Sequence, residues 1–265
     1  MNAPREQLTE PLVLRHDREG IATLTLNRPA QFNALDVATL DALQTTLAQV
    51  GEDASVRVVV LAGAGRAFCP GHDLKEMLAN SNQAFLGDLF ARCSEVMLAI
   101  ERLPQPVIAK VHGIATAAGC QLVAAADLAA AADDARFATS GINFGLFCAT
   151  PAVPVSRNIA RKRAFEMLLT GAFIDAPTAL AWGLVNRVVP ASDLDAATEA
   201  LARQMMDKPA AVVAAGKRFF YQQLDRPLVD AYRAASAEIT RCMLAPEAQE
   251  GVGAFVEKRK PRWSV

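Results

Sequence analysis

Two glycine-containing turns hold the residues whose types and spacing could do chemistry. The first follows residues 106–111, a short apolar run rich in β-branched side chains that predicts a buried strand. Gly113 then turns the chain, and the small side chains from Thr116 onward predict a helix start that a ligand can approach closely. Free backbone N–H groups at such a helix start can stabilise a developing oxyanion. A buried strand and helix of any α/β protein would show the same pattern, so this turn alone does not decide the function.

Other chemistries are poorly supported by the motifs. The stretch from Gly63 to Phe68 resembles the start of a dinucleotide-binding fingerprint, but it lacks the third glycine and runs into Cys69-Pro-Gly instead of a helix. The sequence contains no G-x-S-x-G elbow, its three histidines have no partner at metal-ligand spacing, and its cysteines form no CxxC pair. We therefore expect neither a metal site nor a serine nucleophile.

The second turn follows an expected strand at 56–61 and contains the sequence Phe-Cys-Pro-Gly-His-Asp-Leu at 68–74. Together the two turns resemble the crotonase superfamily, the enoyl-CoA hydratases and isomerases. Further segments resemble family signatures and follow the family's order along almost the whole chain. These segments are 26–35, 168–171, 179–189 and 250–260. Within the family, residues 113–122 and 145–148 are similar to the enoyl-CoA hydratase domain-containing protein 3 branch.

The resemblance implies a binding site for an acyl-CoA thioester. In the family, two backbone N–H groups bind the thioester oxygen as it becomes enolate-like, and the matching positions here are His72 and Ala118. Coenzyme A enters as part of the substrate, and we expect no permanently bound cofactor. The positions that the resemblance assigns to coenzyme A are Ala30, Phe32, Ala67, Gly71, His72, Asp73, Leu74, Gly119 and Lys258. Lys258 or Lys260 would reach the phosphates, from this subunit or an adjacent one, unless the basic tail is simply solvated.

The acid/base residues depart from the family pattern. Hydratases place one glutamate in the central helix and another in the loop that follows, and this sequence has Gln121 and Gly141 at those positions. Glutamine takes up no proton and glycine has no side chain, whereas each positioned acid or base is typically worth ~10² to 10⁴ in rate. His72 and Cys148 are the candidate replacements. The alternatives are a His72 side chain directed elsewhere and a Cys148 that only packs in the core.

Two hypotheses of different classes follow. In the first, the chain is an enzyme, either an enoyl-CoA hydratase-like lyase of fatty acid metabolism or a catalyst of another reaction of the superfamily. It then uses the oxyanion hole with a base other than glutamate. In the second, it binds acyl-CoA without turnover, as a carrier, a sensor or an assembly subunit. Only the first hypothesis needs a proton-transfer group within reach of the acyl chain, and family precedent favours it.

Composition excludes several classes of protein. The 265-residue chain is 52% hydrophobic with a net charge of −1, which suits a large buried core and gives no electrostatic case for nucleic acid. No apolar run approaches the ~18 to 20 residues that span a bilayer, and the polar first ten residues contain no signal-peptide core. Five irregularly spaced cysteines argue against a disulfide framework. We therefore expect a cytoplasmic protein with no membrane or nucleic-acid partner.

Predicted strands and helices alternate in the first part of the chain, and only helices are predicted after residue 190. Strands at 12–15 and 21–26 flank a turn at 17–20 and form a hairpin. The other expected strands are 56–61, 106–111, 128–132 and 185–189. The expected helices are 37–51 with Asp36 as its N-cap, 74–79, 84–103, 116–126, 157–170, one beginning at 175, and then 193–207, 210–223, 228–244 and 246–258.

This order of elements predicts an α/β fold. By the resemblance, residues 11–190 form a crotonase-like ββα spiral core, preceded by a flexible N-terminal arm at 1–10. A helical C-terminal region at 191–265 would then build homotrimers, which often pair into hexamers in the family. The sequence contains no internal repeat, so the spiral is implied by the resemblance alone.

Overall fold

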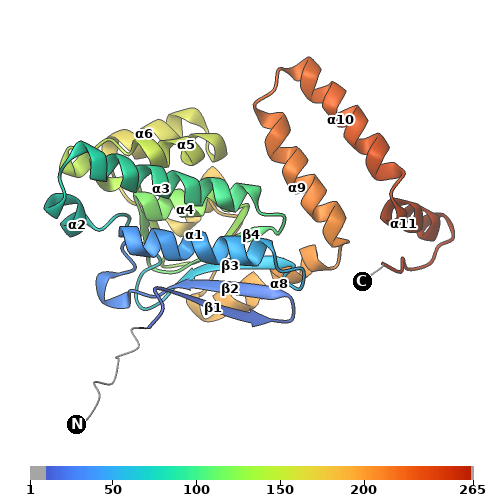
Figure 1. The fold of residues 1–265 in the computed structure, drawn as a ribbon, viewed down its shortest axis with the longest axis horizontal. Coiled ribbons are helices and arrows are strands. Elements are labelled where there is room, and N and C mark those ends of the chain that lie inside the picture. Colours follow the sequence, from blue (N-terminus) through green and yellow to red (C-terminus); the bar gives the residue numbers. More distant parts are fainter. Residues whose placement is uncertain (1–9, 264–265) are drawn as a thin grey trace, which may run out of the picture.

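A six-stranded sheet forms the centre of the molecule, and the predicted α/β class is confirmed. The computed structural model describes residues 10–263, so residues 1–9 of the predicted arm lie outside the described part. The strand order is β1-β2-β3-β4-β6-β9, with the first pair antiparallel and the other pairs parallel (Figure 1). The strands are β1 (Val13–Arg18), β2 (Ile21–Leu26), β3 (Val58–Gly63), β4 (Val107–Val111), β6 (Leu128–Ala132) and β9 (Arg187–Val189).

Helices account for most of the remaining chain. They are α1 (Val37–Gly51), α2 (Leu74–Ala79), α3 (Gln83–Arg102), α4 (Ala118–Ala125), α5 (Ala149–Asn158), α6 (Arg161–Thr170), α7 (Ala176–Trp182), α8 (Leu194–Met206), α9 (Ala210–Leu224), α10 (Leu228–Met243) and α11 (Pro246–Val256). Asp36 caps α1 as predicted, because its side chain accepts a hydrogen bond from the N–H of Thr39 at 2.8 Å. The predicted helix at 157–170 is confirmed only from Arg161 to Thr170. The chain there is extended at Ile159, whose side chain is buried, and it forms the two helices α5 and α6.

The β1–β2 hairpin is confirmed, but its turn is shorter than predicted. The strands pair as far as Arg18 and Ile21, so that only Glu19 and Gly20 connect them. Both connecting residues have positive φ, 50° and 81° respectively, which is the geometry of a tight turn that matches the twist of the strands. The expected turn at 17–20 therefore begins two residues too early.

Helices cover both faces of the sheet. α1 and α3 pack side by side on one face, and α8 packs on the other (Figure 1). Because side chains alternate along a strand, Val59 of β3 joins the large core under α1 and α3, whereas Val58 contacts the smaller core with Leu201 and Ala202 of α8. α8 thus closes the core although it lies beyond residue 190, where the sequence predicts the C-terminal region to begin.

A second, smaller sheet supports the segment that starts α4. It consists of β5 (Ile114–Thr116), β7 (Arg136–Ala138) and β8 (Ile174–Asp175), with β5 and β7 parallel. These strands are not predictable from the sequence pattern, because two or three residues are too few to show an alternation of apolar and polar side chains. β5 leads directly into α4, and β7 leads into the short 3₁₀ helix η2 (Ser140–Phe144). The second sheet therefore brings the starts of α4 and η2 together.

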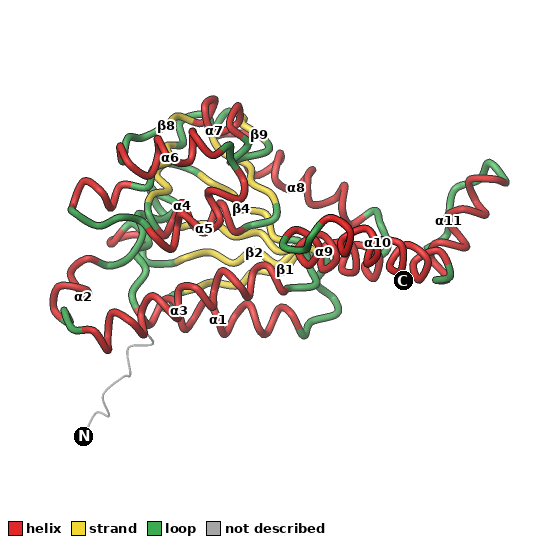
Figure 2. The backbone as a smooth tube through the Cα atoms, turned by 90° about the horizontal axis from the view of Figure 1, so that it is seen from above, coloured by secondary structure: helices red, strands yellow, loops and turns green. Residues whose placement is uncertain are grey.

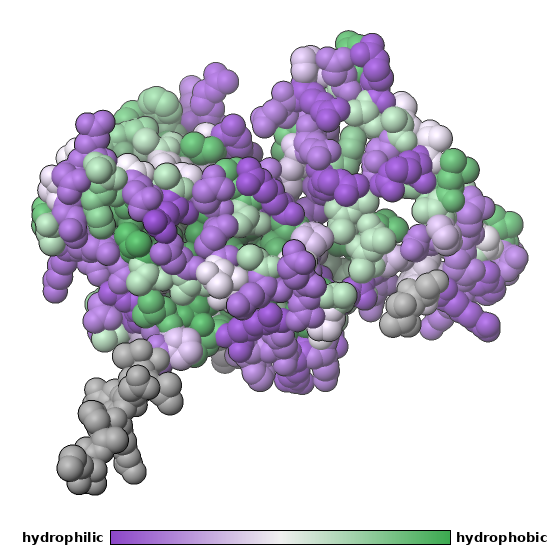
Figure 3. All heavy atoms as spheres, viewed as in Figure 1, coloured by the Kyte–Doolittle hydropathy of each residue, from purple (hydrophilic) through white to green (hydrophobic). Residues whose placement is uncertain are grey.

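The last three helices form an arm that extends from the core. α9 and α10 make a helical hairpin and α11 lies at the far end of the molecule in both ribbon views (Figures 1 and 2). Large apolar side chains remain exposed on this arm, and Figure 3 shows apolar surface there. They are Val212, Phe220, Leu224, Leu228, Val229, Tyr232, Ile239, Met243, Leu244, Val252, Phe255 and Val256. An exposed apolar surface of this kind marks an interaction site.

A buried ionic cluster fixes α9 to the core. Nζ of Lys217 donates hydrogen bonds to Oδ2 of Asp127 at 2.7 Å and to the carbonyl oxygens of Ile100 and Gln105 at 2.8 and 3.0 Å. The hydroxyl of Tyr221 donates to Oδ1 of Asp127 at 2.7 Å. Burial lowers the pKa of Lys217, although the Asp127 carboxylate opposes this shift. The carboxylate thus joins two side chains of α9 to the segment between α4 and β6.

Candidate active site

A cavity of about 640 Å³ lies where α2, α3, α4 and η2 approach one another. Its wall is built from the turn at 30–34, the segment at 70–77, the start of α4 and the loop at 140–151. Most of the wall is apolar and includes Met77, Phe90, Phe144, Leu146, Phe147 and Pro151. A concave, mainly apolar site with a few polar groups is typical of small-molecule binding.

The segment from Gly71 to Asp73 presents the N–H group of His72 to this cavity. It pairs with Leu35 in a short parallel bridge, in which the Leu35 N–H donates to the Gly71 carbonyl at 2.8 Å and the Asp73 N–H donates to the Leu35 carbonyl at 2.9 Å. Because successive N–H groups of an extended segment point to opposite sides, that of His72 points away from Leu35. His72 lines the cavity, and its N–H meets no acceptor within residues 10–263.

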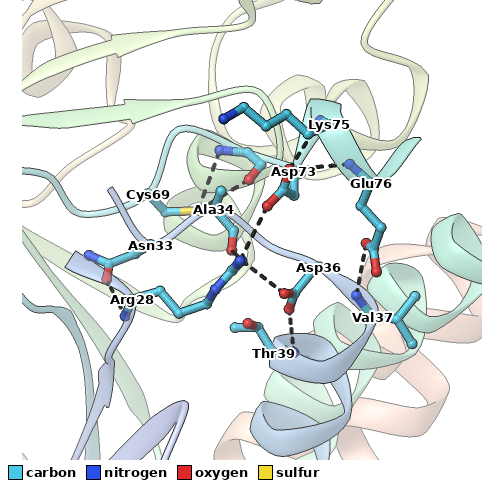
Figure 4. Close-up of polar contacts among 11 residues, drawn as sticks. Arg28, Asn33, Ala34, Asp36, Val37, Thr39, Cys69, Asp73, Lys75 and Glu76 are labelled. Carbon is cyan, nitrogen blue, oxygen red and sulfur yellow. Dashed lines mark hydrogen bonds and ion pairs between the residues drawn. The ribbon is translucent and has the colours of Figure 1, made fainter. Parts of the chain in front are cut away.

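An ionic network holds this segment in place (Figure 4). Arg28 contacts the carboxylates of Asp36 and Asp73 at 3.0 and 3.2 Å. Asp73 also caps α2 by accepting hydrogen bonds from the N–H groups of Lys75 and Glu76. Burial alone would raise the pKa of Asp73, but these N–H donors and Arg28 outweigh it and hold the pKa below its usual value. Asp73 is therefore an ionised and fully engaged group at the edge of the cavity.

The second free N–H group belongs to Ala118, the first residue of α4. Ala117 precedes it with φ of 49° and ψ of −119°, a conformation that residues other than glycine rarely adopt. The N–H of Ala117 donates to the carbonyl oxygen of Ala138 at 3.0 Å, so that the end of β7 holds the strained turn. Ala118 lines the cavity, and in the described part of the chain its N–H has no acceptor.

The two segments that carry these N–H groups are in direct contact. A Cβ atom on Gly71 would lie 2.9 Å from Cβ of Ala117 and 3.2 Å from the nitrogen of Ala118. A Cβ atom on Gly119 would lie only 2.0 Å from the carbonyl oxygen of Cys69. Close packing therefore excludes a side chain at both glycines. It also brings His72 and Ala118, whose N–H groups have no acceptor in the described residues, close to one another in the cavity wall.

Gln121 and Gly141, to which the resemblance assigns the family's glutamates, offer no carboxylate and little room for one. Gln121 is 3% exposed and does not line the cavity; its Oε1 atom lies 3.9 Å from Sγ of Cys93 in α3. Gly141 does line the cavity, but a Cβ atom there would lie 2.6 Å from the Leu146 carbonyl oxygen and 2.7 Å from Sγ of Cys148. The loop thus closes over Gly141 and leaves no space for a longer residue.

Cys148, one of the two predicted replacements, lies in the cavity wall. Its Sγ atom accepts the N–H of Gly141 at 3.3 Å, and the residue is 8% exposed. Burial raises the pKa of the thiol, so that it stays protonated near neutral pH. A protonated thiol is a weak base and a weak nucleophile. Cys148 therefore acts in this geometry as a support for the loop.

His72, the other predicted replacement, has a buried and neutral side chain. Its ring packs edge-on against Phe90, with the ring centroids 5.4 Å apart. Both ring nitrogens are buried, and neither has a hydrogen-bond partner in the described residues. Burial lowers the pKa of the imidazole, which leaves a nitrogen lone pair free to accept a proton. A turn of the ring would be needed to bring that nitrogen to the cavity surface.

The structure brings only part of the predicted coenzyme A set to the cavity. The predicted residues that line it are Ala30, Phe32, His72, Asp73 and Leu74. Ala67, Gly71 and Gly119 are buried behind the wall. Lys258 follows α11, which lies at the opposite end of the molecule from α2 (Figures 1 and 2), so it does not approach the cavity of its own chain.

Two cations and two hydroxyl groups near the cavity are absent from the predicted set. The guanidinium of Arg66 lies over the ring of Phe32, 5.2 Å from its centroid, and Lys75 lines the cavity. Neither cation has an acidic partner within residues 10–263. Ser140 lines the wall, and its hydroxyl oxygen lies 2.8 Å from that of Thr116. Arg66 and Lys75 flank the second turn in sequence, a signal that could have identified them, whereas no motif marks the hydroxyl pair.

Comparisons with known proteins identify the family to which the chain belongs. The family model described as Enoyl-CoA hydratase/isomerase matches residues 16–265. The chain is 42% identical to the enoyl-CoA hydratase domain-containing protein 3, mitochondrial, of Xenopus laevis, over 96% of this chain and 86% of that protein. A solved enoyl-CoA hydratase of Mycobacterium smegmatis is 57% identical with a TM-score of 0.94, covering 96% of this chain and 99% of that one. Human enoyl Coenzyme A hydratase domain-containing protein 3 is 40% identical with a TM-score of 0.92, covering 95% and 100%.

The comparisons contradict the expected cytoplasmic location. The similar proteins of Xenopus laevis, Mus musculus and Homo sapiens are all named as mitochondrial. The expectation of a cytoplasmic protein depends on the lack of an apolar signal-peptide core. Such a core directs secretion, whereas the transit peptides that direct import into organelles are amphipathic. Within residues 10–263 no helix is both long and apolar enough to cross a membrane.

Proposed function

Because this chain belongs to the enoyl-CoA hydratase/isomerase family, as the sequence resemblance predicts, we propose that it binds an acyl-CoA thioester in the cavity. The thioester oxygen lies between the N–H groups of His72 and Ala118. The observation that carries this proposal is that neither N–H group has an acceptor within residues 10–263 and that both residues line one mainly apolar cavity. Each such donor is typically worth about 3 to 4 kcal/mol to an enolate-like transition state. The reaction that this arrangement supports best is the hydration of an enoyl-CoA.

Coenzyme A binds as part of the substrate along the outer end of the cavity. Phe32 is 44% exposed there and, with Ala30, offers an apolar surface to the pantetheine or the adenine. Arg66 and Lys75 are free to bind the phosphates, because neither side chain pairs with an acid in the described part of the chain. In this proposal Lys258 contacts coenzyme A only from a neighbouring subunit.

The proposed reaction differs from the usual hydratase mechanism in its proton-transfer group. Asp73 is the one carboxylate among the described residues that line the cavity, and Arg28 and the N-terminus of α2 engage it fully. The thiol of Cys148 is protonated. This leaves the neutral imidazole of His72, once its ring has turned toward the cavity, as the base that takes a proton from water while the water oxygen bonds to the β-carbon. The imidazolium then returns that proton to the α-carbon of the enolate, which completes the addition of water.

A second candidate function is acyl-CoA binding without turnover, as in a carrier, a sensor or an assembly subunit. One observation favours it: the cavity holds no unengaged carboxylate, and the loop closes over Gly141 so that none fits there. The donors at His72 and Ala118 would then bind the thioester in its ground state. In either case the exposed apolar surface of α9 to α11 is proposed to build a homotrimer, or a hexamer of two trimers.

Crotonyl-CoA hydration by the wild type, beside a His72→Phe variant, tests the proposal. Phenylalanine keeps the backbone N–H and the contact with Phe90 but cannot accept a proton. We expect the variant to lose ~10² to 10⁴ in rate, the usual value of a positioned base, while calorimetry still detects butyryl-CoA binding. His16→Phe, on an exposed position of β1, is the matched control.

The outcomes separate the two candidates. A wild type that binds butyryl-CoA but does not hydrate crotonyl-CoA supports binding without turnover. A His72→Phe variant as active as the wild type contradicts the role of His72 as base and leaves the thioester site intact. A wild type that binds no acyl-CoA contradicts both candidates.

A further inference from the structure

A second cavity, of about 340 Å³, lies at the other end of the central sheet from the proposed thioester site. Arg57 and Pro106 line it, and they directly precede β3 and β4, which run parallel to one another. The thioester site is instead built from segments that follow these two strands. The end of α1, the end of α8 and the start of α9 complete the wall of the second cavity. This cavity has no part in the function described so far.

The wall of the second cavity contains hydrogen-bond acceptors that have no donor. Nε2 of Gln105 donates to the carbonyl oxygen of Val50 at 3.0 Å, which identifies Oε1 as the remaining atom of the carboxamide. Gln105 lines the cavity and is 7% exposed, and its Oε1 atom is buried without a partner in the described residues. Glu52, two residues after Val50, also lines the cavity and forms no ion pair within residues 10–263. The end of α1 therefore offers two free acceptors.

The same wall contains donors that have no acceptor. Ala210 and Ala211 are the first residues of α9, no side chain caps this helix, and in the described part of the chain their N–H groups have no acceptor. Nη2 of Arg57 donates to the carbonyl oxygen of Lys208 at 2.6 Å, which holds the guanidinium near the start of α9. Arg57 has no acidic partner among the described residues. A helix N-terminus beside a guanidinium favours a carboxylate.

The two sets of polar groups border one cavity but do not pair with each other. A carboxylate alone would leave the acceptors at the end of α1 without a donor, and an ammonium alone would leave the start of α9 without an acceptor. A ligand that carries both charges can satisfy both sets. Between them the wall is apolar at Val56, Met205 and Val213, which suits an alkyl side chain. The volume lies at the lower end of the range of small-molecule sites.

We propose that this cavity binds a small zwitterion with an apolar side chain, which is the chemistry of a free aliphatic amino acid. Its carboxylate accepts hydrogen bonds from the N–H groups at the start of α9 and lies near Arg57. Its ammonium donates to Oε1 of Gln105 and to the carboxylate of Glu52. Because Nζ of Lys217 donates to the backbone carbonyl of Gln105 at 3.0 Å, the ligand joins α9 to the core beside the buried ionic cluster. This site is independent of the proposed function.

Calorimetry with L-leucine and two truncated analogues tests the inference. 4-Methylpentanoate lacks the ammonium of leucine, and 3-methylbutylamine lacks its carboxylate. We expect the wild type to bind leucine and to bind each analogue at least about tenfold more weakly, because each analogue loses hydrogen bonds to a charged group. Leucine should also raise the melting temperature, since it binds the folded chain.

Two substitutions separate the two ends of the ligand. Glu52→Gln, at an exposed position, removes the negative charge beside the ammonium. It should weaken leucine about fivefold to tenfold and leave 4-methylpentanoate within about twofold. Ala210→Pro removes one N–H group at the first position of α9, where proline is tolerated, and Pro209 before it is already extended. It should weaken leucine and 4-methylpentanoate but not 3-methylbutylamine. Glu166→Gln, on an exposed position of α6, is the matched control.

Each outcome supports or overturns the inference. It is overturned if leucine at about 10 mM does not bind, because the polar groups of the wall then need no ligand of this class. It is also overturned if 4-methylpentanoate binds as tightly as leucine, or if Glu52→Gln and Ala210→Pro leave the affinity for leucine unchanged. Displacement of leucine by butyryl-CoA would place leucine in the thioester site and would overturn the inference as well. The proposed function is decided separately, by the binding of butyryl-CoA.

Discussion

Where α9 meets the core, the buried charges are paired: the carboxylate of Asp127 accepts hydrogen bonds from Lys217, Tyr221 and the N–H of Val107. In the wall of the cavity, by contrast, the N–H groups of His72 and Ala118 have no acceptor in the described residues. Leaving a buried donor unpaired costs about 1 to 3 kcal/mol, so it persists only where the rest of the fold enforces it. The comparison suggests that the paired groups stabilise the fold and that the unpaired donors are reserved for a ligand.

The two regions also differ in what holds their polar groups in position. The junction uses ionic side chains from segments that are 90 residues apart in the chain. The cavity uses backbone groups. These groups are held in place by the close packing of glycines and by one strained alanine, Ala117. A substitution should therefore break the junction by removing charge, and the cavity by adding volume.

The largest effect is expected from Asp127→Ala. This change leaves the ammonium of Lys217 buried without its counter-charge, and breaking a buried pair typically costs about 3 to 5 kcal/mol of unfolding free energy. Urea denaturation would measure the loss. Lys110→Met is the matched control, because it removes a cation whose partner Asp195 is 85% exposed, and exposed pairs contribute about 1 kcal/mol or less. Equal losses in the two variants would contradict a special role for the junction.

Gly119→Ala should reduce the stability less than Asp127→Ala does, but it should weaken acyl-CoA binding strongly. The added methyl group would lie 2.0 Å from the carbonyl oxygen of Cys69, so the start of α4 must move. We expect a loss of about 1 to 3 kcal/mol in stability and at least a tenfold weaker affinity for butyryl-CoA. Gly216→Ala in α9 is the control, because a Cβ atom there meets nothing within 4 Å and alanine favours a helix. Unchanged binding in Gly119→Ala would argue against the oxyanion hole.

The pH dependence of stability tests the unpaired state of the His72 side chain in the cavity wall, and we expect a smaller effect on the unfolding free energy than in the two substitutions above. Burial lowers the pKa of His72 in the folded state from the unfolded value of 6.5. The unfolded chain therefore binds more protons below that pH, and this contribution to stability, fully present above 6.5, is lost as the pH falls toward the folded pKa. His72→Phe should flatten the fall in unfolding free energy between pH 7 and 5. An identical slope in wild type and variant would show that the imidazole is not buried as described.

Carboxylates introduced at Gln121 and Gly141 should not create the hydratase site that the resemblance implies for those positions. In Gly141→Glu the first side-chain atom already meets the Leu146 carbonyl and Cys148, so we expect destabilisation of about 1 to 3 kcal/mol. In Gln121→Glu the new carboxyl group is buried beside Cys93 and stays protonated. Neither variant should hydrate crotonyl-CoA faster than the wild type, and a gain in rate would contradict the closed loop at Gly141.

The sequence predicts those features that depend on neighbours in the chain. Asp36 caps α1 because its side chain bonds an N–H three residues later, and the pattern shows this directly. The two turns that hold His72 and Ala118 could be identified from glycines, small residues and the family resemblance. Features that depend on distant partners could not be predicted. The ion pair of Asp127 with Lys217 and the contact between the Ser140 and Thr116 hydroxyls form only when segments far apart in sequence meet.

The two positions of the expected acid/base pair also show that the sequence does not predict features that depend on the folded loops. By the family resemblance, Gln121 and Gly141 stand at the positions where hydratases carry glutamates. The sequence does not show that the loop from Leu146 to Cys148 closes over Gly141. The space left for a side chain at Gly141 depends on how the loop folds back onto that residue. The sequence also does not show that both nitrogens of His72 are covered.

The most direct test of the central claim measures the thioester carbonyl itself, because backbone donors cannot be removed by changing side chains. Butyryl-CoA labelled with ¹³C at the carbonyl would be followed by isotope-edited infrared spectroscopy, free in solution and in a saturated complex with the protein. If the N–H groups of His72 and Ala118 bind the carbonyl oxygen, its stretching frequency should fall on binding. An unchanged frequency in the saturated complex would contradict the oxyanion hole, and with it the proposed function.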